Sequence, residues 1–211
     1  MLYLFKGKLT KMSNIAKEFE SRIMLTDDEY LSIVSFYMKL YPNKHFIQNT
    51  NVYYDSDDLF LRKQGITFRL RIINDISSEL TIKIKGKNGD TEINDKLNIA
   101  QYNLLKNNNI FPDGEVKKYL STLPYSINEY KVITTLFNRR LEIEFDDHLL
   151  VIDKNTYSDI VDYNLEIETK DNIESAQRHL KKYIEKFHLS LINQKYQGKA
   201  TRAILAAKEN R

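Results

Sequence analysis

Charged side chains near the front of the chain recur at every second residue, and this pattern constrains the fold more than any other feature. Glu18, Glu20 and Arg22 alternate with an aromatic, a small and an aliphatic residue. Two residues is the period of a β-strand, so we expect the three charges on one strand face. The same alternation of charged and large apolar residues returns at Arg69-Leu70-Arg71, Lys83-Ile84-Lys85, Arg140 to Glu144, and Glu166-Ile167-Glu168.

Most of these segments pair charges of the same sign. A sheet with one solvated face also alternates, but such a face normally mixes its charges. At about 7 Å and an effective dielectric of about 20, each like pair costs on the order of 2 kcal/mol before salt screening. A polyanion would relieve the basic pairs, and divalent cations would relieve the acidic pairs. We therefore favour charges that point into a closed, polar interior, with the apolar phase packed outside, over a solvated sheet face.

Composition excludes several classes of protein. A length of 211 residues fits one domain, residues 1–211, and the net charge of +3 is too small to indicate nucleic-acid binding. The chain has no cysteine, which excludes a thiolate nucleophile, a disulfide framework and a cysteine-based zinc site. No apolar run is long enough to predict a membrane span. These features fit a cytoplasmic protein.

Several segments are expected to lie outside the strands. Residues 1–13 are predicted to be an N-terminal extension, with Met12 as an alternative start, and residues 98–128 to be a helical insert. A helix is expected from Asp27 to Leu40, with an apolar side made by Leu31, Val34, Met38 and Tyr41. The four histidines, at positions 45, 148, 179 and 188, show no ligand spacing, so we expect surface or packing roles for them.

Taken together, the charged segments resemble the CYTH family within the triphosphate tunnel metalloenzyme superfamily. Glu18-x-Glu20-x-Arg22 is similar to the family's Glu-x-Glu-x-Lys signature. The family's Asn-x-Tyr-x-Asp, Leu-Arg-x-Arg and Leu-Thr-x-Lys motifs have counterparts at Asn51 to Asp55, Thr67 to Arg71 and Leu80 to Lys83. Further positions follow in the family's order: Glu92, Arg140, Asp153, Glu166, Glu168 and Lys195.

The resemblance implies an α+β, mainly β fold. This fold is a closed antiparallel eight-stranded β-barrel, open at both ends and polar inside, with helices packed outside. The charge pattern leads to the same polar interior independently of the resemblance.

The resemblance also implies chemistry on a triphosphate. Known members hydrolyse inorganic triphosphate or thiamine triphosphate, or cyclise ATP, with Mg²⁺ or Mn²⁺. We expect metal-dependent hydrolysis of inorganic triphosphate (tripolyphosphate) or another short triphosphate-bearing substrate. The alternatives are an adenylyl cyclase, a thiamine or nucleoside triphosphatase, and a non-catalytic triphosphate-binding module. The expected partner is a small-molecule triphosphate, and we expect no binding to nucleic acid or to a membrane. The expected assembly is a monomer or homodimer.

The resemblance assigns roles to individual residues. The basic residues would bind the triphosphate: Arg22, Arg69, Arg71, Lys83, Lys85, Arg140 and Lys195. The acidic residues would hold one or two hard cations: Glu18, Glu20, Asp153, Glu166 and Glu168. The residues expected to take part in catalysis are Glu18, Glu20, Lys83, Glu92 and Glu168.

One position departs from the family pattern, another requires a choice between two arginines, and a glutamate pair carries an expectation about stability. Arg22 replaces the signature lysine, and since arginine stays charged, a proton donor would have to be Lys83 or Lys85. Arg140 is preferred to Arg139 because it shares the strand phase of the neighbouring glutamates. Glu166 and Glu168 have no basic residue nearby in sequence, so we expect mutual repulsion and expect Glu→Gln at either site to leave the metal-free protein as stable or more stable.

Overall fold

The computed structural model describes residues 15–191 and 197–209. The predicted N-terminal extension and alternative start, and also Lys195, lie outside the described residues. The elements are, in chain order, β1 (Ile15–Leu25), α1 (Asp27–Leu40), β2 (Ile47–Asp55), α2 (Phe60–Lys63), β3 (Ile66–Ile73), β4 (Ser77–Ile84), β5 (Asp90–Leu97), α3 (Ile99–Asn108), α4 (Glu115–Leu120), the 3-10 turn η1 (Ile127–Glu129), β6 (Lys131–Glu144), β7 (Leu149–Tyr157), β8 (Ile160–Thr169), α5 (Ile173–Phe187) and α6 (Lys199–Glu209).

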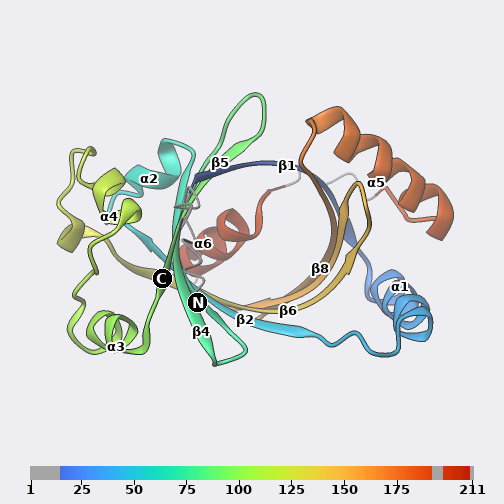
Figure 1. The fold of residues 1–211 in the computed structure, drawn as a ribbon, viewed down its shortest axis with the longest axis horizontal. Helices are drawn as coiled ribbons and strands as arrows, with labels where there is room; N and C mark the ends of the chain where they lie inside the picture. Colours follow the sequence, from blue (N-terminus) through green and yellow to red (C-terminus); the bar gives the residue numbers. More distant parts are fainter. Residues whose placement is uncertain (1–14, 192–196, 210–211) are drawn as a thin grey trace, which may run out of the picture.

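The eight strands close into a barrel in the order β1-β5-β4-β3-β2-β6-β7-β8, with antiparallel neighbours throughout. Strand β1 closes the ring because its first residues pair with β5 and its residues 19–25 pair with β8. Helices α1 to α5 lie outside the ring of strands (Figure 1). The predicted closed eight-stranded barrel with outer helices is therefore confirmed.

The apolar phase of the strands faces outward and forms the hydrophobic core beneath the helices. Leu141, Ile152 and Ile167 are 0–1% exposed and pack with residues of α1 and α5. On another part of the wall, Phe68 and Ile82 pack with residues of α3 and α4. Each such side chain contributes about 1.5–3 kcal/mol when buried. Because this packing stabilises the wall from outside, the inward phase of the strands is free to carry charges.

The segment between β5 and β6, where a helical insert over residues 98–128 is predicted, contains α3, α4 and η1. Asn98 caps α3 through a reciprocal pair of hydrogen bonds with Gln101. Within the described residues, no helix is both long and apolar enough to cross a bilayer.

The last helix, α6, lies within the ring of strands (Figure 1). Its Ala203 and Ile204 pack against the inward-facing side chains of Tyr53, Leu136 and Tyr157. Helix α6 therefore lies at the end of the barrel where β2 and β7 finish, a placement that the expected tunnel did not include. A helix can enter there because these three inward positions are apolar or aromatic rather than charged.

Candidate active site in the barrel interior

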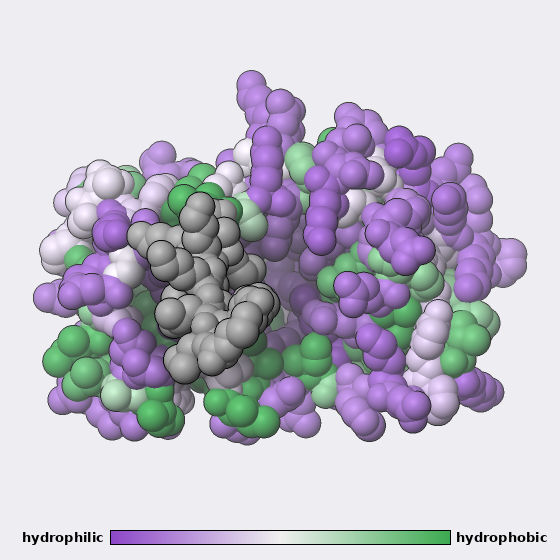
Figure 2. Space-filling view, in the orientation of Figure 1, coloured by the Kyte–Doolittle hydropathy of each residue, from purple (hydrophilic) through white to green (hydrophobic). Residues whose placement is uncertain are grey.

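The barrel interior contains a cavity of about 250 Å³, lined by side chains from every strand except β7 and by the start of α6. In the space-filling view, the middle of the molecule is hollowed and hydrophilic (Figure 2). The predicted site residues that line the cavity are Glu18, Glu20, Arg22, Arg69, Arg71, Lys83, Lys85, Glu92, Arg140, Glu166 and Glu168.

Three carboxylates meet on the wall formed by β1 and β8. Glu20 pairs directly with Glu168 in the strand register, and Arg22 pairs with Glu166. One oxygen from each of Glu20, Glu166 and Glu168 lies within 4.8 Å of the other two. Burial raises the pKa of Glu168, and the charges of Glu166 and Glu18 add to this rise against the opposing effect of Arg140. An all-oxygen donor set fits a hard divalent cation such as Mg²⁺ or Mn²⁺.

Glu166 lies among cations as well as carboxylates. Lys199 Nζ is 3.0 Å from one of its oxygens, and an Arg22 nitrogen is 3.3 Å from the other. Burial by itself raises the pKa of Glu166, but Lys199 and Arg22 outweigh that effect and lower the pKa to about 2. Glu166 therefore stays ionised, and its ion pairs could not be read from the local sequence.

A basic wall lies on β3 and β4. Arg69 and Arg71 project from β3, and Arg71 donates through Nε to Asn51 at 3.3 Å. The Nε of Arg69 is buried without a hydrogen-bond partner among the described residues. Burial, together with the charges of Arg69 and Arg140, lowers the pKa of Arg71 to about 10. These guanidinium groups thus repel one another, and a bound anion would relieve the repulsion.

Lys83 lies where the basic and acidic walls meet. Its ammonium is 3.0 Å from Glu18, 3.3 Å from Glu20 and 3.6 Å from Glu92. These partners come from β1 and β5, so the barrel register, rather than sequence proximity, assembles the cluster. Lys83 is consequently within reach of these three carboxylates and of any anion in the cavity.

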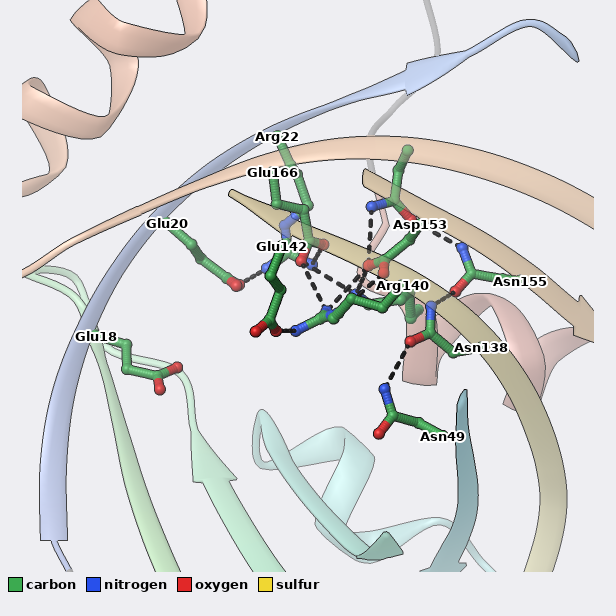
Figure 3. A network of polar contacts seen from close by, with 12 residues as sticks. Glu18, Glu20, Arg22, Asn49, Asn138, Arg140, Glu142, Asp153, Asn155 and Glu166 are labelled. Carbon is green, nitrogen blue, oxygen red and sulfur yellow. Dashed lines mark hydrogen bonds and ion pairs between the residues drawn. The ribbon is translucent and has the colours of Figure 1, made fainter. Parts of the chain in front are cut away.

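Arg140 and Asp153 form a buried pair between β6 and β7 (Figure 3). Arg140 donates Nε and NH2 to the two Asp153 oxygens at 2.9 and 3.0 Å. Asp153 is 0% exposed, and Lys199 also donates to it. Asp153 is not among the described residues that line the cavity, so the structure does not place it with Glu20, Glu166 and Glu168. Arg139, the rival of Arg140, is exposed and lies outside, 3.7 Å above the Phe46 ring.

A chain of buried amides supports this pair from the adjoining strands (Figure 3). Asn49 donates to Asn138, Asn138 donates to Asn155, and Asn155 donates to Asn164. Asn164 in turn donates to Asp153 at 3.4 Å. Because a buried amide without a partner costs about 1–3 kcal/mol, the chain fixes its members in one arrangement. Sequence reasoning missed this chain, although each asparagine shares the inward strand phase.

Residues 16–197 match the CYTH domain, which covers most of the chain. The chain belongs to the CYTH domain family. Its relatives include YjbK of Bacillus subtilis, named as a candidate triphosphatase. YjbK is 28% identical over 176 residues, with 82% of this chain and 87% of YjbK covered.

Solved structures agree with this CYTH fold. A protein from Bacillus halodurans, described as a candidate adenylate cyclase, has a TM-score of 0.80 at 26% identity, covering 90% of this chain and 98% of its own. HpAC1 from Hippeastrum has a TM-score of 0.68 at 15% identity, covering 90% and 95%. HpAC1 is described as a candidate adenylyl cyclase with a dominant triphosphatase activity.

Lys199 is a cavity residue that sequence reasoning missed, and it lies just beyond the matched CYTH region. It begins α6 and projects toward Asp153 and Glu166. The predicted lysine at this end of the chain was Lys195, which the structure does not describe. Helical spacing could have indicated Lys199, because it shares a stripe with the buried residues Ala203 and Ala206.

Proposed function

We propose that this CYTH domain hydrolyses inorganic triphosphate, or another short triphosphate-bearing substrate, inside the barrel with Mg²⁺ or Mn²⁺. The observation that carries the proposal is that a basic wall on β3 and β4 and an acidic wall on β1 and β8 line the same cavity. Seven basic and seven acidic side chains line its described part. A triphosphate with two divalent cations carries little net charge, so a balanced lining of this kind suits the two together.

The basic wall would bind and orient the phosphate chain. Arg69 and Arg71 offer guanidinium groups to phosphate oxygens, and Lys83 and Lys85 offer ammonium groups from the next strand. Arg140 reaches the cavity from β6, two strands away from β3 around the barrel, and Asp153 fixes its direction. Binding between two walls would restrict rotation of the substrate and hold its scissile bond in one place.

The acidic wall would hold the divalent cation through Glu20, Glu166 and Glu168, with Glu18 and Glu92 close to Lys83. When bound, such a cation neutralises phosphate oxygens and lowers the pKa of a coordinated water. Asp153, predicted as a ligand, is better suited to positioning Arg140 and Lys199, because it accepts from both and is not among the described residues that line the cavity.

Proton transfer to the leaving phosphate requires a group that can lose a proton. Arg22 replaces the lysine of the family signature, and its guanidinium pairs with Glu20 and Glu166. It can stabilise charge but cannot act as an acid. Lys83, among the carboxylates and beside the basic wall, is our candidate for this role.

Two observations favour hydrolysis of a small triphosphate over the alternatives. YjbK is named as a candidate triphosphatase, and HpAC1 is described as having dominant triphosphatase activity. In addition, Tyr53 is the only aromatic side chain among the described residues that line the cavity, so stacking surfaces for a base are scarce. A monomeric or homodimeric state and a cytoplasmic location stay predictions.

A phosphate-release screen tests the proposal. Tripolyphosphate, ATP and thiamine triphosphate would each be supplied with Mg²⁺, with Mn²⁺ or with EDTA, and the ATP reaction would also be analysed for cyclic AMP. We expect metal-dependent phosphate release, fastest from tripolyphosphate. Binding of tripolyphosphate without release from any substrate would identify a binding module, and cyclic AMP as the main product would identify a cyclase. Either result would overturn the proposal.

A further inference from the structure

Two of the four histidines meet outside the barrel, although their sequence spacing gave no sign of it. His148 lies in the turn between β6 and β7, and His179 lies on α5. Their rings stack with centroids 4.2 Å apart and an interplanar angle of 23°. The pair borders a second cavity of about 360 Å³, separate from the barrel interior, that is also lined by Asp147 and Tyr183.

Asp147 brings a carboxylate to both imidazoles. One of its oxygens is 2.6 Å from Nδ1 of His148, and the other is 3.3 Å from Nε2 of His179. One potential ligand atom from each of Asp147, His148 and His179 lies within 4.8 Å of the other two. The β6–β7 turn and α5 thus bring the carboxylate and the two imidazoles close together.

The second nitrogen of His148 has its own partner. Nε2 lies 2.8 Å from the Tyr183 hydroxyl, and that hydroxyl hydrogen-bonds Tyr37 on α1. If Nδ1 binds an ion, Nε2 carries the proton and donates it to Tyr183, which fixes the ring's orientation and tautomer. Metal-binding histidines usually have an outer partner of this kind.

Burial and charge suit the imidazoles to bind metal in their neutral form. The side chains of His148 and His179 are only 8% and 11% exposed, whereas Asp147 is 61% exposed. Burial lowers the pKa of His179, and the neighbouring His148 lowers it further against the effect of Asp147. The exposed side of Asp147 leaves room for water as a further ligand.

The basic side chains near Asp147, His148 and His179 are directed elsewhere or are exposed to solvent. Lys182 and Arg178 on α5 are exposed, so solvent screens their charges. The Lys186 ammonium lies over the rings of Phe36 and Tyr37, at 4.2 and 5.4 Å from their centroids. Among the described residues, the Asp147 carboxylate therefore pairs with the two imidazoles and not with a lysine or arginine.

We propose that Asp147, His148 and His179 form a second metal site that takes a transition-metal ion of the Zn²⁺ class. Two imidazole nitrogens and one carboxylate favour such ions, in contrast to the all-oxygen group inside the barrel. A bound ion would tie α5 to the β6–β7 turn, whose strands carry Arg140 and Asp153. The proposal does not depend on the hydrolysis proposed above.

Cu²⁺ is the most selective probe, because nitrogen ligands leave a distinct splitting in its electron paramagnetic resonance spectrum. The full chain would be saturated with Mg²⁺ to occupy the interior, and then given one equivalent of Cu²⁺. Wild type and His45→Gln, which changes an exposed histidine, should show splitting from two nitrogens. The double variant His148→Gln, His179→Gln should lose this signal. A nitrogen signal that persists in the double variant, or is missing from wild type, would overturn the proposal.

Calorimetric titration with Zn²⁺ provides the second measurement. Asp147→Asn changes an exposed side chain, so it should fold like wild type, and we expect it to weaken the site at least tenfold. Wild type should bind one more Zn²⁺ than the double histidine variant under the same Mg²⁺ excess. Equal stoichiometry and affinity in wild type, Asp147→Asn and the double variant would show that the histidines serve packing alone.

Discussion

Glu166 and Glu168 lie two residues apart on β8 and face the same cavity, but their surroundings differ. Lys199 and Arg22 pair with Glu166, whereas at Glu168 burial outweighs the opposing charge of Arg140, and nearby carboxylates add to the effect of burial. The sequence predicted one behaviour for both, since it shows no base close to either. Cations from α6 and β1 make the difference, and their approach depends on the closed barrel.

Glu168→Gln should stabilise the metal-free protein at neutral pH. The folded state raises the pKa of Glu168 above 4.5, so the proton is held more tightly in the folded than in the unfolded chain. The stability this provides is complete below the unfolded pKa and is lost as pH rises through the folded pKa. Thermal unfolding at pH 7 should show a higher Tm for Glu168→Gln, and the difference should shrink toward pH 4.5. A lower Tm at pH 7 would contradict this.

Glu166→Gln should have the opposite effect, which corrects the expectation drawn from the sequence. The folded state lowers the pKa of Glu166 to about 2, so its contribution is present above pH 4.5 and is lost as pH falls toward 2. Removing the charge leaves Lys199 underpaired and should cost about 3–5 kcal/mol at pH 7. Urea unfolding beside the exposed control Glu144→Gln measures this. Equal stability of the two variants would disprove the pairing.

Arg69→Ala should lower kcat/KM for tripolyphosphate without lowering the affinity for the metal ion. A charge-assisted contact to phosphate contributes about 1.5–3 kcal/mol, which corresponds to a loss of about 10- to 100-fold in kcat/KM. Arg139→Ala is the matched control, because that guanidinium lies outside over Phe46. Steady-state kinetics with tripolyphosphate, together with metal titration, make the comparison. Equal kcat/KM in both variants would remove Arg69 from the site.

The strands could be predicted from the sequence more securely than the helix faces. Period-two alternation settles which residues share a strand face, so the inward charges and the choice of Arg140 followed directly. Helix α1 offers two neighbouring apolar stripes, and the predicted one was wrong for Leu31, which is 53% exposed. Tyr30, Ile33 and Tyr37 are buried instead, and the Tyr30 ring stacks on Tyr163 of β8. Only the partner surface decides between such stripes.

The placement of helix α6 inside the barrel could not be predicted from the sequence. Nothing in the local sequence pattern of α6 states that this helix enters the barrel. Arg202 anchors it there through paired bonds to Asp162 at 2.8 and 2.9 Å. Lys199 became a site residue as a consequence of this placement.

Arg202→Gln should loosen α6, because the Asp162 side chain is only 14% exposed and would lose its cation. We expect a loss of about 1–3 kcal/mol in unfolding free energy. Amide hydrogen exchange over residues 199–209 should also become faster. Lys208→Gln, at an exposed position of the same helix, is the control. Unchanged exchange in Arg202→Gln would show that packing alone holds the helix.

At the scale of the whole molecule, the fold inverts the usual arrangement of a small barrel. The hydrophobic core lies between the wall and the outer helices, while the interior contains equal numbers of basic and acidic side chains in its described lining. The alternation that begins at Glu18 predicted this inversion. Outward apolar packing stabilises the wall, and the interior remains available for charged ligands.

The most direct test of this account is phosphate release from tripolyphosphate, measured in one assay for wild type, Glu168→Gln and Arg139→Ala. Each protein would be given Mg²⁺ or EDTA. The account predicts turnover by wild type and Arg139→Ala with Mg²⁺, no turnover by any protein in EDTA, and loss of turnover in Glu168→Gln although it folds. Full activity of Glu168→Gln, or activity of wild type in EDTA, would contradict a metal-dependent triphosphate site inside the barrel.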